Sequence, residues 1–159
     1  MKKALLLLLV AASLGACKKN DDNAPRSNTD LLTARNWRLS AETTTTVVNN
    51  NPPKTTDSYA SAAACERDDF LKFNADHSIT SDEGPVLCNP ADPQTQTGTW
   101  KFENDEAKLT ITDPTVPGPG QTFDVISLSA STMRLHGTAT YSFGGVTAVA
   151  TVDETLTAF

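Results

Sequence analysis

Two adjacent glycines, Gly144 and Gly145, lie between two runs in which apolar and polar residues alternate, and this arrangement limits the fold more than any other feature of the chain. A Gly-Gly pair readily forms the tight turn of a β-hairpin, and a period of two is typical of strands that bury one face. With the glycines as turn residues, the apolar face pairs Phe143 with Val146, Tyr141 with Ala148, Ala139 with Ala150 and Met133 with Leu156. The other face is largely polar and places His136 opposite Asp153. Because a shift of one residue would turn the apolar side chains outward, the pattern predicts one register.

One predicted pair breaks the apolar pattern. Leu135 lies opposite Glu154, which places a carboxylate on the inward face of the hairpin. We interpret this pair as a β-bulge or as a position near the rim of the fold that water reaches. The alternative is that Glu154 contacts a ligand.

The rest of the chain is also rich in predicted strands, because residues of high β propensity recur between turn residues. These strands are expected at about 37–48, 69–74, 77–83, 97–104, 107–112 and 123–128, and the hairpin supplies the last two. A helical turn is expected at 28–32 with Asn28, Thr29 or Asp30 as its N-cap, a loop at 49–54, and a short helix within 57–67. Eight strands joined mostly as consecutive hairpins predict an all-β fold, an eight-stranded antiparallel up-and-down barrel.

The N-terminal segment has the layout of a secretory signal peptide, with Lys2 and Lys3 before an apolar run and small residues up to Ala16. The run is too short for a transmembrane helix. The sequence "LGAC" at 14–17 resembles the lipobox of bacterial lipoproteins, in which the cysteine is acylated and becomes the first residue. We therefore predict a signal peptide over 1–16, lipidation of Cys17, a flexible tether over 17–29 and a barrel domain over 30–159. The alternative is an ordinary signal peptide followed by a chance cysteine.

The predicted anchor also predicts a location. Two or three acyl chains, such as palmitate, hold a protein stably on a membrane, whereas a single chain does so marginally. We expect the protein to be anchored in a bacterial outer membrane, on its periplasmic or its cell-surface face. Residues 19–22, "KNDD", resemble the export tags of Bacteroidota-type lipoproteins that reach the cell surface.

The chain contains three cysteines, and export would place them in an oxidising compartment. With Cys17 acylated, Cys65 and Cys88 remain to form a disulfide. The bond would close a loop of about 24 residues and stabilise the fold by about 3 kcal/mol. A metal site or a catalytic thiol is the alternative, although no histidine lies at ligand spacing from either cysteine.

Several motifs together resemble one known family. The stretch "CERDDFLKF" at 65–73, the second cysteine, and "GTW" at 98–100 are similar to the lipocalin-like domain of small Bacteroidota lipoproteins. The resemblance covers about 31–159. It implies an eight-stranded antiparallel barrel or a half-open calyx in which Cys65 and Cys88 are bridged.

The inward face of such a barrel would suit a small hydrophobic ligand. We expect the ligand-lining residues to be Trp37, Phe73, Trp100, Tyr141 and Glu154, among further inward residues Leu39, Ile79, Phe102, Leu109, Ile111, Met133 and Phe143. An eight-stranded barrel holds either one small ligand or a core filled by side chains. Two hypotheses follow. One is a lipid-anchored binding protein, and the other is a structural or partner-binding lipoprotein with a filled barrel, whose loops at 49–54 and 113–121 contact an envelope protein or a glycan.

Charge argues against other classes of partner. The formal net charge is −6, and it becomes −8 when Lys2 and Lys3 leave with the signal peptide. An acidic domain binds nucleic acid poorly. We expect no nucleic-acid partner and a monomeric domain.

Catalytic and metal motifs are missing from the sequence pattern. His77 and His136 are the two histidines of the chain, and no catalytic triad is discernible. The acidic pairs at 68–69 and 82–83 lack the spacing of an EF-hand loop and are expected to face solvent. We expect no enzymatic activity, no cofactor and no bound metal.

Overall fold

The structure is a computed structural model that describes residues 26–112 and 120–159. The predicted signal peptide, Cys17 and most of the predicted tether lie outside the described residues. The helices are α1 (Asn28–Thr33) and α2 (Ser58–Ser61). The strands are β1 (Asn36–Val48), β2 (Lys54–Asp57), β3 (Phe70–Phe73), β4 (Ser78–Asp82), β5 (Thr95–Glu103), β6 (Lys108–Thr112), β7 (Gln121–Leu128), β8 (Thr132–Phe143) and β9 (Val146–Ala158). No helix in these two ranges is long and apolar enough to cross a membrane.

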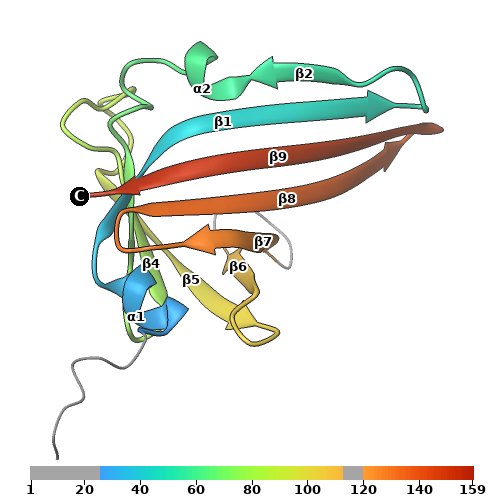
Figure 1. The fold of residues 1–159 in the computed structure, drawn as a ribbon. Coiled ribbons are helices and arrows are strands. Elements are labelled where there is room, and N and C mark those ends of the chain that lie inside the picture. Colours follow the sequence, from blue (N-terminus) through green and yellow to red (C-terminus); the bar gives the residue numbers. More distant parts are fainter. Residues whose placement is uncertain (1–25, 113–119) are drawn as a thin grey trace, which may run out of the picture.

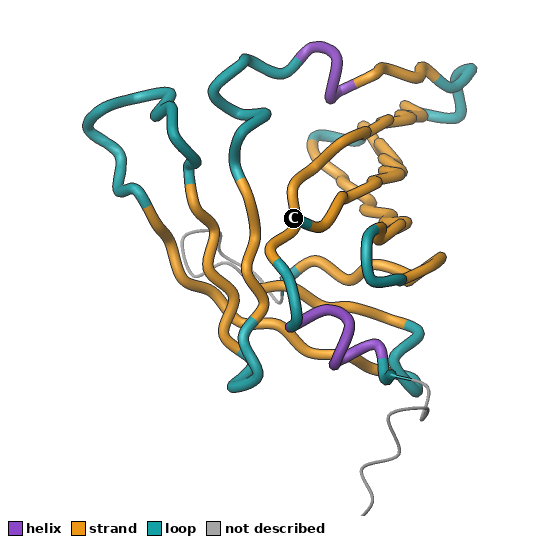
Figure 2. Tube along the Cα trace, turned by 60° about the vertical axis from the view of Figure 1, so that its left-hand side comes forward, coloured by secondary structure: helices purple, strands orange, loops and turns teal. Residues whose placement is uncertain are grey.

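Eight of the strands form a closed antiparallel barrel, as predicted (Figure 1). From β3 to β9 each strand pairs with the next one along the chain, and β1 pairs with β3 on one side. The barrel closes because β1 also pairs with β9, from Trp37 opposite Ala158 to Val48 opposite Ala148. Figure 2 shows the strands curving round a common interior, with α1 at one end.

The remaining strand, β2, was not predicted: the sequence assigned Lys54 to a loop and Asp57 to a short helix, and assigned nothing to the two residues between them. Lys54–Asp57 pairs with residues 43–46 of β1, outside the barrel. All four of its residues are exposed, so no alternation of apolar and polar residues marks them in the sequence. The helix expected within 57–67 is limited to α2, which the Asp57 carboxylate caps by accepting the Ala60 N–H (2.8 Å).

The hairpin of β8 and β9 has the predicted register at every pair, with Gly144 and Gly145 in the turn at positive φ. The ladder passes through Leu135 and Glu154 without a shift, so the bulge interpretation of this pair is wrong. Register shifts lie instead in the flanking ladders, between Leu39 and Ala41 of β1 and between Val125 and Ser127 of β7.

One end of the barrel is closed by a packed core. Its buried side chains are Leu32, Trp37, Phe73, Ile79, Trp100, Leu109, Phe123, Met133, Leu135 and Leu156. Helix α1 contributes Leu32, whose carbonyl oxygen accepts the Trp37 indole N–H at 2.8 Å. This bond ties the helix to the start of β1.

Two further contacts hold α1 in place. Ser27, rather than the predicted residues 28–30, is the N-cap, and its hydroxyl accepts the Asp30 N–H at 3.0 Å. From the turn between β5 and β6, the Glu106 carboxylate accepts the N–H groups of Asn28 (2.7 Å) and Thr29 (3.1 Å). Thr29 also donates its hydroxyl to Glu106, and this bond is the main reason that the pKa of Glu106 lies below its usual value.

The other end of the barrel is open. Strands β1, β8 and β9 run on beyond the shorter strands, as the long arrows of Figure 1 show. The β7 ladder reaches β8 only as far as Gly137, so residues 138–143 of β8 have no neighbour on that edge within the described ranges. This end of the barrel is therefore less covered by neighbouring strands than the end at α1.

Candidate ligand-binding site

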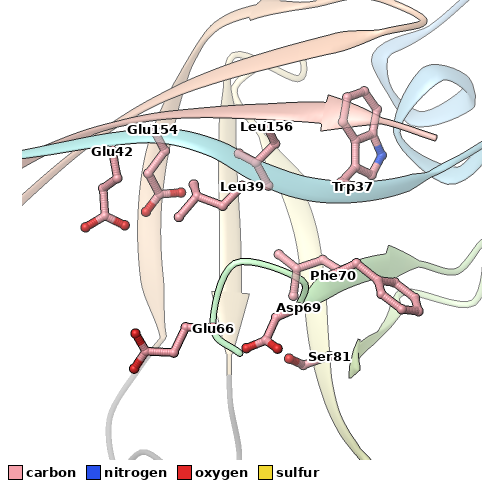
Figure 3. A pocket seen from close by; sticks show the side chains of 10 residues that line it. Trp37, Leu39, Glu42, Glu66, Asp69, Phe70, Ser81, Glu154 and Leu156 are labelled. Carbon is pink, nitrogen blue, oxygen red and sulfur yellow. The ribbon is translucent and has the colours of Figure 1, made fainter. Parts of the chain in front are cut away.

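The candidate site begins where one edge of β1 loses its neighbour. Strand β3 pairs with β1 only at Asn36 and Trp37, and β2 pairs only from Thr43 onward. The stretch 38–42 between them has no strand beside it on this edge. This break in the barrel wall borders a cavity of about 240 Å³ (Figure 3).

The cavity has an apolar wall and an acidic rim. Its apolar lining residues are Trp37, Leu39, Phe70, Leu71 and Leu156, and its polar lining residues are Glu42, Glu66, Asp69, Ser81 and Glu154. Figure 3 shows Glu42 and Glu154 side by side on β1 and β9, with Glu66, Asp69 and Ser81 across the space from them. Such a lining can hold the apolar part of a molecule and accept hydrogen bonds from its polar part.

Two further spaces share lining residues with this cavity. A cavity of about 270 Å³ toward the open end shares Glu42 and Glu154 with it and is otherwise lined largely by small residues of β8 and β9. A third, of about 140 Å³, shares Leu71 and Ser81. Because each is smaller than a typical ligand pocket of about 300–1,000 Å³, a ligand of ordinary size would extend across more than one of them.

Glu154 is an inward-facing carboxylate of the site with a strongly raised pKa. Its cross-strand partner on β1 is Glu42, and its partner on β8 is the buried Leu135. Burial, and next the negative charge of Glu42, raise the pKa of Glu154 from 4.5 to about 7. Both causes disfavour the ionised form, so Glu154 is partly protonated near neutral pH.

The opposite wall comes from a loop that the disulfide holds. Cys65 and Cys88 are bonded, with their Cα atoms 5.2 Å apart, so the predicted pair is confirmed. Nearby, the Asp68 carboxylate accepts the Val86 N–H at 3.0 Å. Gly84 also lies against this loop, and a Cβ atom there would lie only 2.5 Å from the Asp68 carbonyl oxygen. The loop after β4 thus supports the segment that places Glu66 and Asp69 at the cavity.

The acidic pairs at 68–69 and 82–83 lie together rather than facing solvent separately. Burial is the main reason that the pKa of Asp69 rises to about 6, followed by the charges of Glu83, Asp68, Glu66 and Asp82. Within the described ranges, no group of three or more His, Cys, Asp or Glu side chains is arranged to hold a metal ion. The acidic side chains around Asp69 make this side of the cavity electronegative.

The five residues predicted to contact a ligand lie in different parts of the structure. Trp37 and Glu154 line the cavity. Phe73 and Trp100 belong to the packed core, where their rings meet edge to face at 5.9 Å and the Trp100 N–H is donated to the Asn74 carbonyl oxygen.

Tyr141 was expected inside the barrel and lies instead at its rim. It borders the 270 Å³ cavity, but it is 63% exposed, and Phe143 beyond it is 91% exposed. Tyr141 lies on the inward face that the alternation predicts. Strands β8 and β9 continue past the strands that would cover them, and the length of those other strands is not visible in the hairpin sequence.

Several lining residues escaped prediction. Glu42 lies in a threonine-rich run, and only the closure of β1 on β9 places it beside Glu154. Glu66 and Asp69 lie in a loop, and no periodic pattern in its sequence predicts that their side chains face the cavity. His136 and Asp153 form the predicted outward pair at 2.8 Å and border neither the 240 Å³ nor the 270 Å³ cavity.

Comparison with known proteins agrees with the geometry. Residues 20–135 match the model of the lipocalin-like domain family. The chain belongs to this family. No match was found among curated proteins or among solved structures. The matched range ends within β8, so the lipocalin-like barrel is completed here by the rest of β8 and by β9. Proteins of the lipocalin-like family are generally binding proteins rather than enzymes.

Proposed function

We propose that this lipocalin-like protein is an exported, lipid-anchored binding protein that holds a small, mainly apolar molecule at the open end of its barrel. The observation that carries the proposal is the cavity beside the break between β1 and β3, with Trp37, Leu39 and Leu156 in its wall. The core fills the end of the barrel that α1 covers, and two cavities that share Glu42 and Glu154 lie beyond it. A barrel that served only as a packed scaffold would not need an opening in its wall.

Binding can be measured with a neutral apolar probe. The chain from Lys18 onward contains every residue of the barrel and its core, and N-phenyl-1-naphthylamine is fluorescent when it enters an apolar site. We expect saturable binding. Ser81 borders two of the cavities, so Ser81→Trp places an indole across them and should weaken binding about tenfold or more, or about 1.4 kcal/mol.

The matched control is Thr80→Trp, which adds the same ring to the other face of β4 because successive side chains of a strand point to opposite faces. We expect this variant to bind the probe as the unaltered protein does. Probe binding that Ser81→Trp leaves unchanged would contradict the proposed site. Absence of any saturable binding would support the structural or partner-binding role instead.

The anchor is the second part of the proposal, and it rests on the charged start, apolar run and "LGAC" sequence before Cys17. In a bacterial host that processes lipoproteins, the protein should fractionate with the outer membrane. Cys17→Ala should carry no acyl chain, and a chain that begins at Lys18 should be a folded, soluble barrel, because the acidic domain has little affinity for an anionic membrane. Labelled palmitate that is still incorporated into Cys17→Ala protein would contradict lipidation at this residue.

A further inference from the structure

The 240 Å³ and the 270 Å³ cavities meet at one pair of like-charged side chains. Glu42 of β1 and Glu154 of β9 are direct cross-strand partners, and both border the 240 Å³ and the 270 Å³ cavities. Like charges opposite each other on a sheet repel and destabilise it. A proton or a bound positive charge between the two carboxylates would relieve this repulsion.

The walls around the pair supply no positive charge of their own. Among the described residues that line these two cavities there is no lysine, arginine or histidine. The loop across the space adds two more carboxylates, those of Glu66 and Asp69 (Figure 3). Beside this acidic rim, Trp37, Leu39 and Leu156 form a continuous apolar wall on β1 and β9.

We propose that the ligand is an amphipathic organic cation, with its apolar chain against Trp37, Leu39 and Leu156 and its ammonium group at Glu42 and Glu154. This inference rests on the proposed function and adds the charge of the ligand to it. The described carboxylates form no group that could hold a metal ion. An alkylammonium group instead needs only nearby acceptors, and hydrogen bonds to charged groups are stronger than neutral ones.

Proton linkage supports the same assignment. Burial and Glu42 keep Glu154 partly protonated near pH 7, and a bound cation would favour its ionised form. The other charged groups facing Glu154 are Glu66 and Asp69, whereas β8 presents Leu135 and Gly137, and β4 presents Ser81. Binding of a cation should therefore release protons and become tighter between pH 6 and 8, while binding of a neutral ligand should not.

The test compares three probes with one chain length and different charges: octylammonium, 1-octanol and octanoate. Isothermal titration calorimetry on the chain from Lys18 onward at pH 8 should give the tightest binding for octylammonium. We expect at least about a tenfold advantage over octanol, and the weakest binding for octanoate. The double variant Glu42→Gln/Glu154→Gln should lose this preference and keep its affinity for octanol. Asp153→Asn, which removes a carboxylate from the outer face of β9, is the control and should keep the preference.

The outcomes separate this inference from the proposed function. If none of the three probes binds, the proposed function itself fails. If octanol binds as tightly as octylammonium, the apolar site stands and the cation assignment is overturned. A preference for octylammonium that survives in the double variant would also overturn it, because the charge that selects the ligand would then lie elsewhere.

Discussion

Trp37→Ala is expected to destabilise the barrel by about 3–5 kcal/mol. The indole is fully buried, and it packs between α1 and the core at the closed end. Its N–H is donated to the Leu32 carbonyl oxygen, so truncation leaves a cavity and also a buried acceptor without its partner. Total stabilities of domains are about 5–15 kcal/mol, and this single change would therefore remove a large share. Urea unfolding followed by circular dichroism measures the loss.

Three matched substitutions test why Trp37→Ala destabilises the barrel. Trp37→Phe keeps an apolar ring but loses the hydrogen bond, and should cost less than Trp37→Ala. Tyr141→Ala and Phe143→Ala remove aromatic rings that are 63% and 91% exposed, and each should change stability by less than about 0.5 kcal/mol. If Phe143→Ala cost as much as Trp37→Ala, the hairpin tip would be covered in solution and the description of an open end would be wrong.

Glu154→Gln is expected to stabilise the protein at pH 8 and to leave its stability at pH 4 nearly unchanged. The pKa of Glu154 is raised from 4.5 to about 7 in the folded protein by burial and by Glu42. Between these values the folded state binds more protons than the unfolded state, so the free energy of unfolding falls as pH rises from about 4.5 to 7 and then levels off. A shift of this size corresponds to roughly 3–3.5 kcal/mol. A neutral amide of the same shape removes the penalty.

The difference in free energy of unfolding between the unaltered protein and Glu154→Gln, measured in urea across pH 4–8, isolates this contribution. Asp69 has a pKa raised to about 6 and acts in the same direction, so the variant should retain part of the pH dependence. Asp153→Asn serves as the comparison for loss of a carboxylate from β9 and should not become more stable at pH 8. If the free energy of unfolding of Glu154→Gln differed from that of the unaltered protein by the same amount at pH 4 and at pH 8, Glu154 would have no raised pKa and water would reach its carboxylate freely.

The strands and the disulfide were largely predictable because their signals are local. Alternation around Gly144 and Gly145 specified every pair of the last hairpin, since a slip would expose its apolar face. The pairing of Cys65 with Cys88 followed from the number of cysteines and the expected use of Cys17. The short β2 was not predictable because all its residues are exposed and, among the described strands, it pairs with β1 alone.

The candidate site was predictable only in part. The sequence indicated that Glu154 is an acid on an inward face, and Trp37 an aromatic residue on the first long strand. Which aromatic residues line space and which fill the core depends on the lengths of the surrounding strands. Phe73 and Trp100 are therefore covered, whereas Tyr141 extends past its neighbours.

What the sequence by itself determined is the class of fold, the strand register of the hairpin and the pairing of two cysteines. Each depends on residues close together in the chain or on a count of residue types. Only the tertiary structure decided where the barrel is open and what faces that opening. Glu42 and Glu154 are more than a hundred residues apart in the chain. They become partners because β1 closes the barrel on β9, and the edge of β1 beside them stays unpaired because β3 is too short to cover it.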